Sequence, residues 1–264
     1  EAVERAVIES KAEAVIHCAA LADVDACEAN PELAHRTNAV MPRLLAEAAR
    51  RRGIRFLHIS TDAVFSGLDS GPYTEDDQPD PLGVYAITKL EGERAVLRAY
   101  PAASVLRVNF FGWSLSGRGS LAEFFVNRLS EGSNVNGFTD VTFCPMFVGD
   151  LAQRLLTIME RDLPGVYHLV GPQAMTKYQF GVEIAQAFGL EAGLIAPQSV
   201  ERSSLTAKRS HNLWLSTHKI STVLQQELPE FSTGLRAFYT QYQQGYPQKI
   251  RSYQQAAKAA QLGA

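Results

Sequence analysis

Apolar and polar positions follow two spacings along the chain, one typical of strands and one typical of helices. Short, mostly apolar segments that read as strands of a buried parallel sheet occur at residues 14–20, 56–60, 105–108 and 166–170. Helical spacing occurs at residues 31–49, 84–99, 121–129, 150–159, 177–188, 217–228 and 233–244. Because strands and helices alternate, the pattern predicts an α/β fold in which right-handed crossover helices join parallel strands.

Several residues mark where the predicted helices begin and end. Pro31 opens the first long helix, and the basic run 50–52 followed by Gly53 closes it. Thr176 is a favourable N-cap, and Gly189 is a favourable stop for the helix between them. Two stretches have irregular compositions: residues 130–140, rich in Gly, Ser and Asn, and residues 254–264, which read as a frayed helix or a tag-like tail.

The rhythm of strands and helices changes after Gly112, which divides the predicted fold in two. Residues 1–112 and 145–172 are predicted to form a doubly wound parallel-sheet domain. Residues 113–144 and 173–264 are predicted to form a smaller, mostly helical lobe that carries the substrate site.

Composition excludes several classes of partner. Hydrophobic residues make up 46% of the 264 residues, which is an ordinary globular share, and the net charge of −3 gives no reason to expect nucleic acid. No apolar run is long enough to predict a membrane span. The spacing of Cys18, Cys27 and Cys144 is not that of a metal site, so no metal is predicted; we expect buried, reduced thiols and a cytoplasmic location.

Candidate chemistry lies where the predicted strands end, since ligands bind there in open α/β sheets. Residues of this kind are Ala19, Ala20 and Leu21 after the first strand, Ser60, Thr61 and Asp62 after the second, and Asn109 and Phe110 after the third. Tyr85 and Lys89 share one face of the helix at 84–99, since they are four positions apart. An ammonium group near a phenol is expected to lower the phenol pKa, although the pair alone also fits a surface contact. Thr61, Tyr85 and Lys89 together could hold and protonate a carbonyl oxygen during hydride transfer.

These residues resemble the extended short-chain dehydrogenase/reductases, and most closely their dTDP-4-dehydrorhamnose reductase branch. The resemblance lies in Ser60-Thr61-Asp62, in Pro81-Leu82-Gly83-Val84-Tyr85 and in Thr88-Lys89-Leu90-Glu91-Gly92-Glu93, and it extends to about residue 190. It implies a Rossmann-like fold, NADPH or NADH as cofactor, and a 4-keto-deoxy nucleotide sugar as substrate. A homodimer is the candidate assembly.

The resemblance also implies individual roles. Tyr85 would donate the proton, Lys89 would bind the nicotinamide ribose, and Thr61 would orient the carbonyl. Other residues implied to contact the cofactor are Ala19, Ala20, Leu21, Ser60 and Arg107, and those implied to contact the substrate are Asp62, Phe110 and Arg209. An ion pair is an equal alternative for Arg107, and His17 and His58 are expected to be packed in the interior.

Two departures from the family pattern affect these expectations. Ala63 and Phe110 stand where the reductases often carry tyrosine and tryptophan, which leaves the sugar open. The glycine-rich loop that binds the cofactor pyrophosphate has no counterpart in the sequence, so we expect roughly 45–60 further residues upstream, the usual size of two βα units.

Two other functions stay open. Nucleotide-sugar epimerases and dehydratases share the Tyr and Lys residues, although the dehydratases usually place an acidic residue where this chain has Ala63. The segment Met175-Thr176-Lys177-Tyr178 also resembles a branch that serves as the regulatory subunit of methionine adenosyltransferase.

Overall fold

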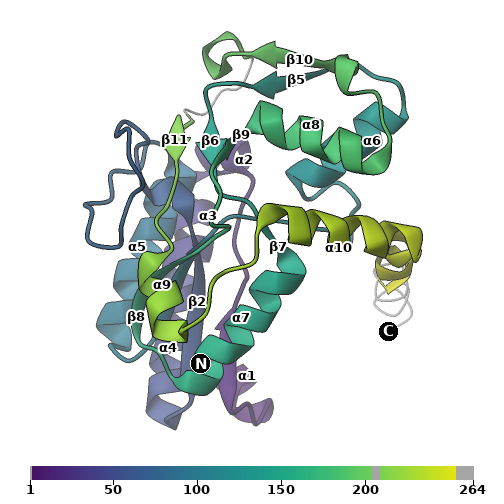
Figure 1. Cartoon of the computed structure of the whole chain (residues 1–264). Coiled ribbons are helices and arrows are strands. Elements are labelled where there is room, and N and C mark those ends of the chain that lie inside the picture. The colour runs from purple at the N-terminus through teal and green to yellow at the C-terminus, as the bar shows by residue number, and fades with distance from the viewer. Residues whose placement is uncertain (1, 204–208, 254–264) are drawn as a thin grey trace. The chain divides into compact units, whose positions relative to one another are not determined.

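A parallel sheet is the centre of the computed structural model, which describes residues 2–203 and 209–253 (Figure 1). The strand order is β1-β2-β3-β8, and the strands are β1 (Ala14–His17), β2 (Arg55–Thr61), β3 (Ser104–Val108) and β8 (Gly165–Leu169). Every adjacent pair in this sheet is parallel. The predicted α/β class is therefore confirmed.

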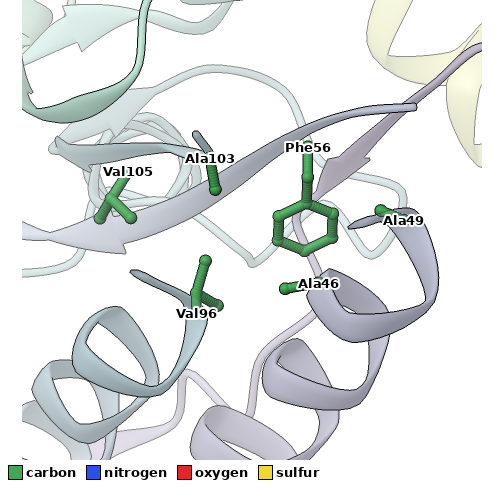
Figure 2. Packing of buried hydrophobic residues seen from close by; sticks show 6 residues of the cluster. All are labelled: Ala46, Ala49, Phe56, Val96, Ala103 and Val105. Atoms are coloured by element: carbon green, nitrogen blue, oxygen red, sulfur yellow. The ribbon is translucent and has the colours of Figure 1, made fainter. Parts of the chain in front are cut away.

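Helices cover both faces of this sheet. The helices that accompany the sheet are α1 (Ala2–Glu9), α2 (Val24–Ala29), α3 (Pro31–His35), α4 (Met41–Arg52), α5 (Val84–Ala99), α7 (Val148–Arg161) and α9 (His218–Leu224). Of these, α1 packs on α4, and α2 and α3 pack on α5. On one face, α4 and α5 pack against β2 and β3 through a buried cluster that Figure 2 shows: Ala46, Ala49, Phe56, Val96, Ala103 and Val105. On the other face, the Lys219 ammonium of α9 lies 4.9 Å from the ring centroid of Tyr167 on β8.

The segment predicted as one helix over residues 31–49 contains a π-helical turn. This turn, Arg36–Val40, separates α3 from α4 and contains the buried side chain of Asn38. The predicted stop is confirmed, since α4 ends at Gly53 with φ 65°, a left-handed conformation that glycine adopts without strain. A π-helical turn inside a helix often marks a functional position.

A second unit contains its own strands and helices. They are β4 (Phe110–Phe111), α6 (Leu121–Ser130), β5 (Val135–Phe138), β6 (Thr142–Phe143), β7 (Met146–Phe147), β9 (Met175–Thr176), α8 (Lys177–Phe188), β10 (Ile195–Gln198) and α10 (Phe231–Gln243). Its core is aromatic, and Phe111 contacts the rings of Phe180 and Phe238 at centroid distances of 5.5 and 5.6 Å. Thr176 caps α8 through a complete capping box, as its sequence predicts.

The chain divides into units differently from the prediction. The first unit contains Glu1–Asn109, Ala152–Val170 and Ser204–Glu227, and the second contains Phe110–Leu151, Gly171–Ser203 and Leu228–Ala264. Segment 204–227, predicted in the helical lobe, joins the sheet unit because Tyr73 pairs with Leu215 and Lys219 Nζ donates to the Val166 carbonyl at 2.9 Å. The strand β11 (Asn212–Leu213) lies in this segment.

Other differences concern single elements. β1 covers only the first part of the predicted run 14–20, and in it His17 is buried while the three residues before it are half-buried. The stretch 130–140, predicted to be irregular, contains β5, which pairs with β10. Helix α9 stops at Leu224 because Gln225 adopts a left-handed conformation with φ 53°. The interpretation of residues 254–264 lies outside the described residues. Within the part of the chain that the structure describes, no helix has the length and apolarity of a membrane span.

Candidate active site

Thr61, Tyr85 and Lys89 meet at the carboxyl ends of β1 and β2. Thr61 is the last residue of β2, and Tyr85 and Lys89 lie in the first turns of α5. The side chains of Thr61 and Tyr85 are hydrogen-bonded to each other. Lys89 Nζ donates to the Ile59 carbonyl of β2 at 2.6 Å and faces Cys18, directly after β1. The structure thus brings together the three residues predicted to carry the chemistry.

The Thr61 hydroxyl connects Tyr85 to the loop that follows β2. Its Oγ1 donates to Asp62 Oδ1 at 3.1 Å and accepts from the Ala63 backbone N–H at 3.2 Å. The Tyr85 phenol lies beside this hydroxyl, and the hydrogen bond between the two side chains lowers the pKa of Tyr85.

The expected lowering of the Tyr85 pKa is wrong for this structure. Burial raises the pKa of Tyr85 to about 12, the hydrogen bond from Thr61 opposes this rise, and the carboxylate of Asp62 adds to it. The Lys89 ammonium is held by the Ile59 carbonyl, and burial lowers its own pKa to about 8. Tyr85 is consequently a protonated phenol at neutral pH, the form that a proton donor requires.

The first turn of α5 is fixed by a residue from α2. Gly83 precedes the helix and offers no side chain to cap it, and Glu28 Oε1 instead accepts the backbone N–H of Val84 at 2.8 Å. A Cβ at position 83 would lie 2.8 Å from the same oxygen, so the glycine leaves room for this carboxylate. A negative group at a helix N-terminus also favours the helix dipole. Glu28 thereby positions the turn that carries Tyr85, a role that the sequence interpretation missed.

Asn38 joins the π-helical turn to the segment after β1. Its Oδ1 accepts the Leu21 backbone N–H at 2.9 Å, and its Nδ2 donates to the Leu21 carbonyl and to Thr88 Oγ1, each at 3.1 Å. Helix α5 approaches this turn closely at Gly92, where a Cβ would lie 2.2 Å from the Asn38 carbonyl oxygen. The two contacts fix the backbone beside Lys89.

Small side chains follow the end of β1. Cys18 and Ala19 are exposed and Ala20 is half-buried, so no side chain larger than a methyl group projects at positions 19 and 20. The hydroxyl of Tyr85 and the ammonium of Lys89 lie at the same edge of the sheet. The exposure of Cys18 corrects the expectation that all three thiols are buried.

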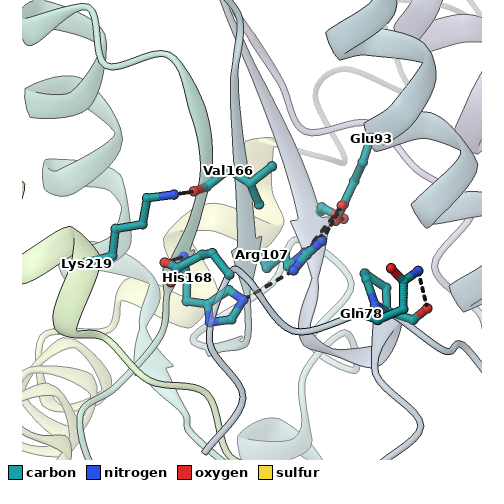
Figure 3. Close-up of polar contacts among 9 residues, drawn as sticks. Gln78, Glu93, Arg107, Val166, His168 and Lys219 are labelled. Atoms are coloured by element: carbon teal, nitrogen blue, oxygen red, sulfur yellow. Dashed lines mark hydrogen bonds and ion pairs between the residues drawn. The ribbon is translucent and has the colours of Figure 1, made fainter.

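Two residues predicted to contact the cofactor have buried side chains. Ser60 and Arg107 are 3% and 4% exposed, respectively, and both lie in the interior (Figure 3 shows Arg107). Ser60 Oγ donates to Glu93 Oε1 at 2.5 Å, and Arg107 Nη2 donates to Glu93 Oε2 at 2.9 Å. Since their polar groups are committed to Glu93, the ion-pair alternative for Arg107 holds and neither side chain is available to a cofactor.

The predicted substrate residues lie in different environments. Asp62 is buried, and its carboxylate accepts from Thr61 and from Asn109 Nδ2, the latter at 2.5 Å, so it fixes the loop rather than facing outward. Arg209 lies 3.7 Å from the Asp25 carboxylate of α2. Phe110 belongs to the second unit and is 49% exposed.

Two buried histidines should make the sheet unit less stable at acid pH. Burial lowers the pKa of His17 to about 4, and burial with the nearby Arg107 charge lowers the pKa of His168 to about 3, from an ordinary 6.5. Below that ordinary value the unfolded chain binds protons that the folded chain does not. The free energy of unfolding should therefore fall by about 1.4 kcal/mol per pH unit for each histidine as the pH decreases toward the folded-state value. Denaturant unfolding at stepwise lower pH measures this slope, and H168N should make it shallower; an identical slope in both proteins would contradict the assignment.

Comparisons with known proteins agree with this geometry. A model of the RmlD substrate binding domain matches residues 1–244. The chain belongs to this family. The family result confirms the resemblance to the dTDP-4-dehydrorhamnose reductase branch and the Rossmann-like fold.

Individual relatives carry several names. The chain is 34% identical over 234 residues to a probable low-salt glycan biosynthesis reductase of Haloferax volcanii, and the alignment covers 86% of this chain and 78% of that protein. It is 35% identical over 211 residues to a dTDP-4-dehydrorhamnose reductase of Mycobacterium tuberculosis (78% and 69% covered). It is 34% identical over 253 residues to the methionine adenosyltransferase 2 subunit beta of Xenopus tropicalis (89% and 72% covered). The crystal structure of a dTDP-4-dehydrorhamnose reductase from Clostridium acetobutylicum superposes with a TM-score of 0.86 at 29% identity, covering 92% of this chain and 85% of that one.

Proposed function

We propose that this RmlD-family protein reduces the keto group of a 4-keto-deoxy nucleotide sugar with NADPH or NADH. The observation that carries the proposal is the protonated Tyr85, hydrogen-bonded to Thr61 beside the fixed ammonium of Lys89. Relatives named as reductases, among them the dTDP-4-dehydrorhamnose reductase of Mycobacterium tuberculosis, support the same chemistry.

The chain's own residues would divide the work between binding and proton transfer. A reduced nicotinamide supplies the hydride, which carries two electrons to the carbonyl carbon. Lys89 would bind the ribose hydroxyls, while Ala19 and Ala20 leave room beside them. Thr61 would turn its hydroxyl hydrogen from Asp62 to the substrate oxygen and so orient the carbonyl. Tyr85 would transfer its proton to that oxygen as negative charge develops there.

Turnover of a defined substrate tests this proposal. The purified product of the complete gene is mixed with NADPH or NADH and with dTDP-4-dehydrorhamnose, and the consumption of reduced cofactor is followed. We expect one cofactor oxidised for each sugar reduced, and no consumption when the sugar nucleotide is omitted. If the protein binds both ligands and no cofactor is consumed, the proposal is wrong.

A second candidate function rests on a specific similarity. The identity to the methionine adenosyltransferase 2 subunit beta extends over 89% of this chain, so a regulatory subunit is the alternative. This function would require a stable complex with a methionine adenosyltransferase catalytic chain. Co-purification of that chain from the native organism, combined with the absence of sugar turnover, would favour the subunit over the reductase.

A further inference from the structure

A layer of polar side chains lies between α5 and the sheet. These side chains occupy neighbouring strands in register: His17 of β1 is opposite His58 of β2, and Ser60 of β2, Arg107 of β3 and His168 of β8 are opposite one another. All are buried. Apolar side chains are the usual contents of such an interface, so a polar layer there calls for a reason other than burial of apolar area.

Glu93 of α5 is the central acceptor of this layer. It is 2% exposed, and its Oε1 accepts from Ser60 at 2.5 Å. Arg107 forms a forked pair with it, since Nε lies 3.1 Å from Oε1 and Nη2 lies 2.9 Å from Oε2. Arg107 is itself held by His168 Nε2 at 3.4 Å and by the Phe65 ring, whose centroid lies 5.1 Å from the guanidinium carbon (Figure 3). The Glu93 carboxyl group is therefore fixed in place beside the Arg107 guanidinium.

Glu93 and Lys89 are four positions apart on α5, which puts them on the same face. They bind consecutive residues of β2, because Lys89 donates to the Ile59 carbonyl while Ser60 donates to Glu93. One turn of the helix is thus attached to the end of one strand at two points. The helix turn that carries Lys89 is therefore held against β2 by the contacts of Glu93 as well as by its own.

The charges around Lys89 give this arrangement an electrostatic consequence. His17 and His58 face Lys89 from the two strands, and burial together with the Lys89 charge lowers the pKa of each, so both are neutral near neutral pH. Burial lowers the pKa of Lys89 to about 8, whereas the carboxylate of Glu93, and to a lesser extent Cys18, raises it. Glu93 therefore opposes the loss of the Lys89 proton.

We propose that Glu93, held by Ser60 and Arg107, is a positioning residue that fixes the Lys89 ammonium and maintains its charge for the reduction. The proposal rests on the proposed function. It gives the polar layer a role in the reaction, whereas an ion pair that only stabilises the fold would leave Lys89 unaffected.

Titration of Lys89 tests the proposal without requiring turnover. Lysine side chains are labelled with ¹³C at Cε, and the Lys89 signal is identified by its absence from the spectrum of K89R. The pH at which this signal is halfway through its titration is then measured by NMR. In E93Q, which removes the charge but nearly preserves the shape, we expect the midpoint to move about one pH unit lower. The matched control is E91Q, since Glu91 lies on the same helix and pairs with His35 at the surface; its midpoint should equal that of the unmodified protein.

The pH dependence of kcat/KM for the dinucleotide connects this titration to the reaction. The loss of activity at high pH should move to lower pH in E93Q by the same amount as the NMR midpoint, and E93D should restore its position. If E93Q does not fold, E93Q/R107M removes both charges of the pair; the titration midpoint of Lys89 should still move lower, but by less than one pH unit, because the Arg107 cation is lost as well. The proposal would be overturned by a folded variant in which the titration midpoint of Lys89 is unchanged, or in which the pH at which kcat/KM falls is unchanged. An unmodified protein that turns over no keto sugar refutes the proposed function instead, whatever the titration shows.

Discussion

Replacing Tyr85 with phenylalanine should lower kcat for keto-sugar reduction by about 10²- to 10⁴-fold, the range typical of general acid catalysis. The phenol is the group that holds a proton beside Thr61, and phenylalanine removes the proton donor while retaining the ring. The KM for the sugar nucleotide should change little, because the lost interaction acts in the transition state. Steady-state kinetics under saturating cofactor measure both parameters.

Tyr100 provides the matched control for this substitution. It follows the last residue of the same helix, and its hydroxyl donates to the Ile54 carbonyl at 3.1 Å. Y100F removes one phenol from the other end of α5, so it should leave kcat close to that of the unmodified protein. Equal losses in Y85F and Y100F would show that the effect comes from the fold rather than from proton donation.

Replacing Arg107 with methionine should lower the free energy of unfolding by about 3–5 kcal/mol. The substitution leaves the Glu93 carboxylate buried without its cation, and an uncompensated buried charge is far more costly than a lost surface ion pair. Denaturant unfolding followed by circular dichroism gives the difference in free energy.

Two further variants separate this effect from general damage. R94M changes an exposed arginine on the same helix as Glu93 and should stay within about 0.5 kcal/mol of the unmodified protein. E93Q/R107M removes both charges, so it should recover most of the stability that R107M loses. If the double variant were as unstable as R107M, the loss would arise from packing around Arg107 and not from the unpaired carboxylate.

Local patterns were enough to predict the helices that frame the site. The bounds of α5, Val84–Ala99, agree with the prediction, and Gly53 ends α4 as its position after a basic run predicts. These features depend on spacing along one segment, so the sequence contains them. The pairing of β1 with β2 does not follow from its apolar residues, because the neighbours of a strand depend on which other strands pair with it.

The site was predictable in its members but not in its internal contacts. The positions of Thr61, Tyr85 and Lys89 follow from strand ends and helix periodicity. The pKa of Tyr85 does not, because it depends on burial and on which oxygen the Lys89 ammonium contacts. The interior position of Ser60 and Arg107 had one available signal: His58 and Ser60 alternate along a buried strand, which places polar side chains on one face under a helix.

Transfer of a deuterium label tests the central claim most directly. The complete gene product is given a dinucleotide with deuterium at the transferable position of the reduced nicotinamide, together with dTDP-4-dehydrorhamnose, and the sugar product is examined by NMR. The account predicts deuterium at the carbon that carried the keto group, formed by the unmodified protein and nearly absent with Y85F over the same time. A product labelled equally fast by Y85F, or a protein that binds both ligands and transfers no label, would contradict it.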